Sequence, residues 1–176
     1  MPETHPETLL TDEIRAHIGM EGPVLTATEQ VERGYVRRFA QAIMDVSPEY
    51  AQAGNRDPDP LSPPLLPLFL FQRPFPSGDY LTERAGDPDF DGTDLSSYTG
   101  LPELPLPGLA LLNGGAEVEF FRYARHGELV EQQSRYLDIR ERQSSKGPML
   151  LVLTETTYST VAGEKLLRVV QTDIRR

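Results

Sequence analysis

Cysteine is absent from this 176-residue sequence, and long apolar runs are absent as well. Without cysteine the chain can form no disulfide bond, thiolate nucleophile or thiolate metal site, which suits a reducing compartment. No run approaches the roughly 20 apolar residues that a bilayer-spanning helix needs. The first residues also lack the basic and apolar regions of a secretory signal. We therefore expect a soluble, cytoplasmic protein with no membrane partner, whose folding rests on packing alone.

Positive charge is also scarce, since the net charge is −10. Phosphate binding needs a field of the opposite sign, so nucleic acid is not an expected partner. The three histidines have no ligand-like spacing. Residues 87–92 begin like a calcium-binding loop, but Tyr98 stands where that loop needs a bidentate glutamate. Nucleotide-binding and nucleophile motifs are missing too, and we expect neither a metal nor a cofactor.

The organisation of the chain favours one domain, because domains commonly run to about 100 to 150 residues. We predict a flexible tail at residues 1–10 and a domain at 11–176. Helical periodicity before about residue 110 and strand periodicity after it predict an α+β domain with an antiparallel sheet. Residues 72–107 are rich in proline, glycine and aspartate, and a connection of this length is expected to be a lid or an interface arm.

Helix signals occur in the first third of the chain. Thr11 or Asp12 can cap a short helix that ends near Met20, before a brief extended piece at residues 24–27. A longer helix is predicted from an N-cap at Thr28 to the pair Ser47-Pro48, because the residue before proline avoids the α region. Its apolar stripe should pack on the sheet and consists of Val31, Tyr35, Val36, Phe39, Ala40 and Ile43.

The apolar run at residues 65–71 lies between prolines, which predicts a buried helix of about two turns with Pro67 in its first turn. After Leu109, runs rich in valine, leucine, threonine and aromatic residues alternate with glycine-containing turns. This pattern predicts a meander of strands with one covered side. The predicted strands are residues 110–123, 128–143, 148–160 and 164–174.

A more specific pattern lies in the segment Phe39–Tyr50, FAQAIMDVSPEY. It resembles a MaoC-like dehydratase, in whose active hydratases a helix ends in the pattern Asp-x-Asn-Pro-x-His. In those enzymes the Asp and the His together hold the water that is added across an enoyl thioester. Here Asp45 matches the Asp, Ser47 the Asn and Pro48 the Pro, but Tyr50 stands at the position of the His. The resemblance therefore implies that half of the catalytic pair is missing.

The chemistry makes this substitution serious. Water addition needs a group of near-neutral pKa that takes a proton and returns it, whereas tyrosine ordinarily titrates near 10. Asp45 alone could orient water, and it is the one candidate catalytic residue. An aspartate at a helix end that hydrogen-bonds the local backbone is an equally good interpretation.

Two further segments extend the resemblance. Active relatives begin the central helix with His-Gly, whose N–H groups receive the thioester oxygen, but this chain has Ser62-Pro63-Pro64-Leu65, and proline has no N–H. The strand-entry pattern of the family, a His-Gly-Gly-like start followed by a Gly-Asp turn, is matched by Asn113-Gly114-Gly115 and Gly127-Glu128. The likeness covers nearly the whole chain apart from the tail and the long loop. It is greatest to the N-terminal, FAS1-like half of double hot-dog dehydratases.

Such halves typically lack the catalytic pair and shape the acyl pocket, while a second hot-dog domain supplies the pair. The resemblance implies a single hot-dog fold, in which an antiparallel sheet wraps around a central helix. It also implies a subunit of an enoyl-CoA or enoyl-ACP hydratase, a hydro-lyase of lipid or steroid metabolism. This subunit would bind the acyl thioester, would be inactive alone and would pair with a catalytic MaoC-like chain. The substrate-binding positions so implied are Ser47, Tyr50, Pro64, Leu65, Asn113, Gly114 and Gly115.

Two alternatives stay open. The chain could be a self-sufficient homodimeric hydratase or thioesterase, in which Asp45 works with a group such as Glu117 or Glu119 of the second copy. It could also be an acyl-binding protein without a catalytic role. A single hot-dog domain leaves a sheet edge to cover, so we expect a dimer with another chain or with itself.

Overall fold

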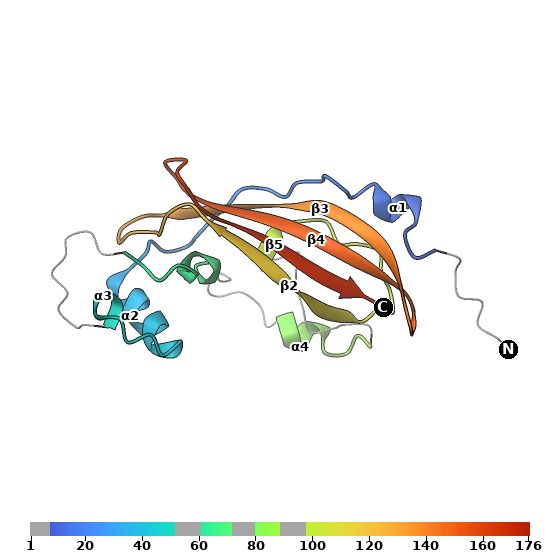
Figure 1. Ribbon diagram of the computed structural model, residues 1–176, viewed down its shortest axis with the longest axis horizontal. Coiled ribbons are helices and arrows are strands. Elements are labelled where there is room, and N and C mark those ends of the chain that lie inside the picture. Colours follow the sequence, from blue (N-terminus) through green and yellow to red (C-terminus); the bar gives the residue numbers. More distant parts are fainter. Residues whose placement is uncertain (1–7, 52–60, 72–79, 89–97) are drawn as a thin grey trace.

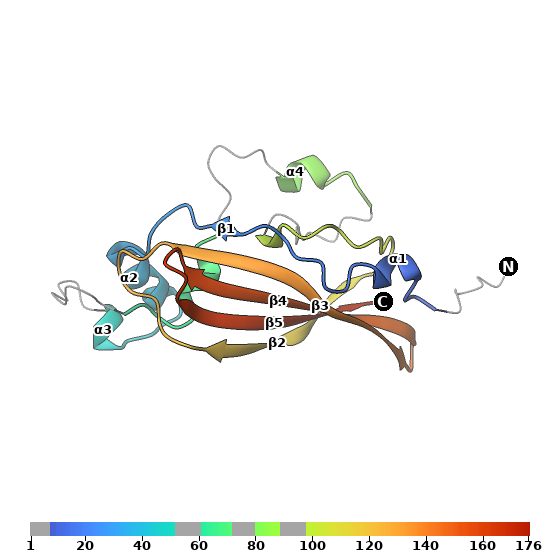
Figure 2. The ribbon, with the colours of Figure 1, turned by 90° about the horizontal axis from the view of Figure 1, so that it is seen from above.

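The computed structural model describes residues 8–51, 61–71, 80–88 and 98–176, and its main element is a five-stranded antiparallel sheet (Figure 1). The order across the sheet is β1-β3-β4-β5-β2. The strands are β1 (Leu25–Thr26), β2 (Leu111–Phe120), β3 (Val130–Ser144), β4 (Gly147–Thr160) and β5 (Lys165–Arg175). Helices α2 and α3 lie beyond one end of the sheet, and α1 lies near the other end (Figures 1 and 2).

The four long strands confirm the predicted ones, but their arrangement differs from a simple meander. Strands β3, β4 and β5 follow one another because tight turns join them, with positive φ angles at Gly147 and Gly163. Strand β2 pairs with β5 instead of with β3, the strand that follows it in the sequence. Both sides of β4 are then occupied, and β2 is left at the outer edge beside β5.

The first helix is shorter than predicted. Helix α1 (Asp12–Arg15) begins as expected, because the hydroxyl of Thr11 accepts a hydrogen bond from the Ile14 N–H. It ends at Arg15 and not near Met20, since the Gly19 and Met20 backbone hydrogen-bonds to Tyr136 of β3. Strand β1 lies inside the predicted extended piece and pairs with β3.

Helix α2 (Arg33–Ala42) begins five residues after the predicted cap at Thr28. Backbone bonds explain the delay: Ala27 N–H donates to the Val130 carbonyl at 2.8 Å, and Val31 N–H donates to Glu128 at 2.9 Å. These bonds hold the segment against the chain before β3, so the local helical preference is overridden.

The apolar stripe of α2 packs into the core as predicted, except at its end. Val31, Val36 and Ala40 are buried, and Tyr35 and Phe39 are partly buried against them. Ile43, which the periodicity assigned to the packed face, is 52% exposed. It lies beyond the last helical turn, where the chain has already left the helix.

The end of α2 also differs from the prediction at Ser47-Pro48. Met44 takes a left-handed conformation with φ of 58°, and the Asp45 N–H donates to the Ala40 carbonyl at 2.8 Å. This is the Schellman arrangement that terminates many helices, here with methionine at the position that glycine usually occupies. Pro48 instead begins the next short helix, α3 (Pro48–Ala51).

The predicted two-turn helix at residues 65–71 is a single 3-10 turn, η1 (Leu66–Phe69). Pro67 lies in its first turn, as expected. Leu66 is fully buried, whereas Leu65 is 41% exposed and Phe69 is 50% exposed. Among the described residues, this turn occupies the place of the expected central helix. Helix α4 (Tyr80–Arg84) lies within the predicted long loop.

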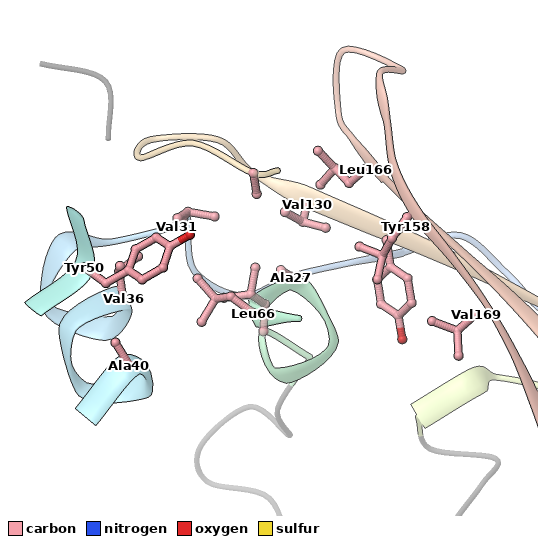
Figure 3. Packing of buried hydrophobic residues seen from close by; sticks show 13 residues of the cluster. Ala27, Val31, Val36, Ala40, Tyr50, Leu66, Val130, Tyr158, Leu166 and Val169 are labelled. Atoms are coloured by element: carbon pink, nitrogen blue, oxygen red, sulfur yellow. The ribbon is translucent and has the colours of Figure 1, made fainter. Parts of the chain in front are cut away.

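Buried apolar residues form two clusters on the covered face of the sheet. The first cluster joins α2, α3 and η1 to the sheet (Figure 3). It consists of Ala27, Val31, Val36, Ala40, Tyr50, Leu66, Leu70, Ala124, Val130, Tyr158, Leu166, Leu167 and Val169. The second cluster consists of Leu10, Ile14, Leu101, Tyr136, Ile139, Leu150 and Val152.

The second cluster includes residues that the sequence assigned to flexible or loop regions. Leu10, from the predicted tail, is buried there, and the Glu141 carboxylate accepts hydrogen bonds from the backbone of Leu9 and Leu10. Leu104 and Leu106, from the predicted long loop, pack against the same cluster. Residues 8–10 and 101–106 thus belong to the packed domain. Over the described part of the chain, no helix is long and apolar enough to cross a membrane.

Replacing Leu66 by alanine tests the contribution of η1 to the first cluster. Because Leu66 is fully buried, L66A should lower the free energy of unfolding by about 2–4 kcal/mol. The neighbouring variant L65A, at a site 41% exposed, should cost less than about 1 kcal/mol. Urea denaturation of both variants measures the difference, and equal losses would contradict this packing.

Candidate functional site

Asp45, the candidate catalytic residue, lies in the turn between α2 and α3. Its carboxylate accepts a hydrogen bond from the Ser47 N–H at 2.9 Å. This local turn connects the end of α2 to the start of α3. Hydrogen bonds from the hydroxyl and the N–H of Ser47 lower the pKa of Asp45 below its ordinary value of 3.8. A carboxylate with a lowered pKa is a weaker base, so this geometry does not favour proton abstraction by Asp45.

Tyr50, at the position of the family histidine, is buried in the first cluster with 8% of its surface exposed. Figure 3 shows its ring beside Val31 and Val36. Its backbone N–H donates to the Ser47 carbonyl at 3.0 Å, which fixes the first turn of α3. Tyr50 therefore contributes a large apolar ring to the core, while the Asp45 carboxylate is engaged by the turn.

The segment at Pro64-Leu65 is held against the chain that follows β2. The Ser62 N–H donates to the Ala124 carbonyl at 2.8 Å, and Ser62 is completely buried. The Leu66 N–H donates to the Pro63 carbonyl at 3.0 Å and so closes the first turn of η1. Because Pro63 and Pro64 carry no N–H, two of the donors that a helix start usually offers are absent here.

Several exposed side chains of η1 and of the turn after α2 are apolar. Phe69 of η1 packs on Phe39 of α2, with ring centroids 5.1 Å apart. The Tyr35 hydroxyl donates to the Phe69 carbonyl at 2.8 Å, which ties η1 to α2. In the turn after α2, Met44 is 85% exposed and Val46 is 86% exposed. The turn that contains Asp45 therefore presents an apolar surface to its surroundings.

Asn113-Gly114-Gly115 form an irregularity in β2, where the register to β5 shifts before Ala116. The Asn113 side-chain oxygen accepts hydrogen bonds from the Gly115 N–H at 2.7 Å and from the Gln171 amide at 3.1 Å. A side chain at Gly114 would place its Cβ 2.8 Å from the Thr172 carbonyl oxygen, and Gly115 has φ of +103°. The two glycines are therefore required by the bulge itself.

The structure brings the first group of predicted residues together and separates it from the second. Asp45, Ser47 and Tyr50 lie at the junction of α2 and α3, and Tyr50 shares the first cluster with the η1 turn. Asn113 pairs with Asp173, near the C-terminal end of β5, whereas α2 and α3 lie beyond the other end of the sheet (Figure 1). Within one copy of the chain, the two groups do not form one site.

A cluster of ion pairs that the sequence did not predict lies on the face of the sheet opposite the two apolar clusters. Glu155 of β4 is buried and accepts hydrogen bonds from Arg135 of β3, at 2.7 Å, and from Arg168 of β5. Burial alone would raise the pKa of Glu155, but the two guanidinium groups together lower it. The cluster depends on the pairing of three strands, and the sequence carried no signal for that register.

Metal ligands do not gather anywhere in the described part of the chain. Each described histidine bonds a backbone carbonyl: Nδ1 of His17 lies 2.9 Å from the Glu13 oxygen, and Nδ1 of His126 lies 2.9 Å from the Val31 oxygen. Most of the segment that begins like a calcium loop lies outside the described residues.

Comparison with known proteins supports the fold. A chain of the ChsH1–ChsH2 complex from Mycobacterium tuberculosis is 16% identical with a TM-score of 0.65, over 92% of this chain and 86% of that one. A chain of the HadBC (3R-hydroxyacyl-ACP dehydratase) complex from the same organism is 15% identical with a TM-score of 0.53, over 90% and 96%. The MaoC-like dehydratase from Rhodospirillum rubrum is 15% identical with a TM-score of 0.51, over 90% and 93%.

These likenesses show a single hot-dog fold, as the sequence predicted. The family is defined more closely by the sequence itself. Residues 16–169 match the family described as the FAS1-like, dehydratase domain region, and the chain belongs to that family. No curated protein sequence matches the chain.

The interaction between Asp45 and Ser47 predicts how stability depends on pH. Because the folded-state pKa of Asp45 is lowered, its contribution is present above the unfolded-state pKa and is lost as pH falls through the folded value. D45A should therefore lower the thermal midpoint at pH 7, and its difference from wild type should shrink below about pH 4.

Thermal unfolding monitored by circular dichroism between pH 3 and pH 7 measures this difference. D45N is the matched control, because its amide oxygen can still accept the Ser47 N–H but does not titrate. Its smaller deficit should be independent of pH. A D45A deficit that stays constant over the whole range would contradict a charged Asp45 in the turn.

Proposed function

We propose that this chain is the non-catalytic, substrate-binding subunit of an enoyl-thioester hydratase and pairs with a MaoC-like chain that carries the Asp/His dyad. The observation that carries the proposal is the state of the two dyad positions. Asp45 is engaged by the turn at Ser47, and Tyr50 is buried among apolar side chains. This arrangement supports a role in which the partner transfers the proton.

The proposed chemistry is the reversible addition of water across the double bond of an enoyl-CoA or an enoyl carried on a protein. The partner's dyad would take a proton from water as the oxygen attacks the β-carbon, and would return a proton to the α-carbon. This chain would supply part of the acyl-binding surface, with Ser47, Pro64 and Leu65, near the α2–α3 junction and η1, as the candidate contacts.

The start of η1 supports the same assignment. A hydratase needs N–H donors where negative charge develops on the thioester oxygen. The two prolines at 63 and 64 remove two such donors, and the Leu66 N–H bonds the Pro63 carbonyl. The oxyanion site is therefore expected on the partner as well.

The competing function is a self-sufficient homodimeric enzyme in which Glu117 or Glu119 completes the site. Both lie on β2, opposite Val170 and Arg168 of β5. The Glu119 carboxylate lies 3.8 Å from the Arg168 guanidinium. This contact engages the Glu119 carboxylate within its own sheet, which does not favour a catalytic role for Glu119.

The test is hydration of a panel of enoyl-CoA substrates by the purified chain, alone and after co-expression with a MaoC-like chain that carries an intact Asp-x-Asn-Pro-x-His pattern. We expect no turnover from the chain alone and turnover from a stable mixed complex, whose composition native mass spectrometry establishes. Robust hydration by the chain alone would contradict the proposal.

Matched variants assign the chemistry to one subunit. D45N in this chain should change the kcat of the mixed complex by less than about threefold, whereas the same change at the partner's dyad should lower it by at least about a hundredfold. If D45N lowers the kcat of the mixed complex as much as the partner's variant does, Asp45 is a catalytic residue and the proposal is wrong.

A further inference from the structure

Strand β2 forms an open edge of the sheet. It pairs on one side with β5, and Figure 2 shows no other described element beyond its outer side. Leu111 is partly exposed, and the other residues of the strand are all exposed. A long exposed edge can pair with a strand of another chain, because its outer N–H and C=O groups are available for a further ladder.

Apolar side chains line this edge on the covered face of the sheet. Val118 pairs with Val169 and Phe120 pairs with Leu167, and both partners belong to the first cluster. Residues directly opposite each other on neighbouring strands share a face. Val118 is nevertheless 37% exposed and Phe120 is 44% exposed. The apolar face of the sheet thus continues onto β2, where no described residue buries it. Exposed apolar side chains of this kind are typical of a surface that a partner covers.

Negative charge lines the same edge on the other face. Glu117 and Glu119 alternate with Val118 and Phe120 along the strand, so their side chains point to the opposite side of the sheet. The side chain of Glu119 is 59% exposed, even though Arg168 lies nearby. A strand that pairs here would therefore meet two carboxylates in succession.

These carboxylates oppose pairing of β2 with a second copy of itself. If two copies of β2 pair antiparallel about a two-fold axis at Val118, Glu117 of each copy lies opposite Glu119 of the other. If the axis passes through Glu117 or Glu119, that glutamate lies opposite the same residue of the other copy. Like charges directly opposite each other destabilise a pair of strands. Registers centred further toward the N-terminus meet the bulge between Asn113 and Ala116, and later ones run past the end of β2 at Phe120. The net charge of −10 on each copy adds to the repulsion.

We propose that Glu117 and Glu119, on the β2 edge where a second hot-dog chain would pair, select the dyad-bearing chain over a second copy of this one. The pairing strand of the partner should carry arginine or lysine on the face that meets the two glutamates. Val118 and Phe120 would be covered by the same contact. This inference rests on the proposed function, since the occupant is the dyad-bearing subunit.

Removing the two charges tests the selection. The probe is the dyad-bearing chain that forms the mixed complex, titrated against wild type and against E117Q/E119Q. The variant should weaken the mixed complex about three- to tenfold, because two favourable cross-strand charge pairs are lost. In sedimentation of the isolated chain, the same variant should self-associate more strongly than wild type.

The control is E21Q/E29Q, which removes the same charge near the opposite edge of the sheet. Glu21 and Glu29 are both exposed, and the backbone of Glu21 forms an isolated β-bridge with that of Arg135 in β3. This variant should change neither equilibrium. If E117Q/E119Q weakens the mixed complex but strengthens self-association, the two charges discriminate between partners. A variant that only damaged the fold would weaken both associations.

The outcomes separate this inference from the proposed function. If E117Q/E119Q leaves the affinity and the hydration rate of the mixed complex unchanged, selection by the two glutamates is overturned while the proposed function stands. If wild type forms no mixed complex and instead pairs with itself through β2, both are overturned. Weakened mixed binding together with strengthened self-association supports both.

Discussion

The pairing of β4 with β3 on one side and β5 on the other is the interaction on which the rest of the structure depends. Its register decides which residues face the two apolar clusters, since side chains alternate between faces along a strand. It places Tyr158 against Val130 and Leu167 in the first cluster. It also brings Glu155 between Arg135 and Arg168 on the other face. A slip of one residue would bury the charges and expose the core.

The position of β2 follows from this arrangement. Strand β4 is occupied on both sides and the outer side of β3 pairs with β1, so β2 joins the sheet beside β5 and forms the edge opposite β1. The bulge at Asn113 limits how far that edge stays regular, and the segment after it leaves Val118 and Phe120 exposed. Together with the tyrosine at position 50, this geometry supports the proposed role as a partner subunit.

The sequence predicted the parts of the fold that local patterns determine. All four long strands and the start of α1 were placed correctly from alternation, turn glycines and the cap at Thr11. The start of α2 was not, because backbone bonds from Ala27 and Val31 to the chain around β3 hold the preceding segment extended. The position of β2 next to β5 was missed for a similar reason, since it depends on contacts between distant segments.

The candidate site shows the same limit. The pattern around Asp45 and Tyr50 was sufficient to indicate the family and the missing half of the dyad. It could not reveal that Tyr50 is buried among apolar residues, or that Met44 and Val46 are left exposed beside the Asp45 turn. Both depend on how α2 ends, and a methionine in a left-handed conformation is difficult to predict from sequence.

The most direct test of the partner-subunit account is a continuous-variation titration. The hydration rate is measured while the mole fraction of this chain and the dyad-bearing chain is varied at constant total concentration. The account predicts no rate with this chain alone and a maximum at an intermediate mole fraction set by the stoichiometry of the complex. A rate that rises in simple proportion to the amount of either chain alone would contradict it.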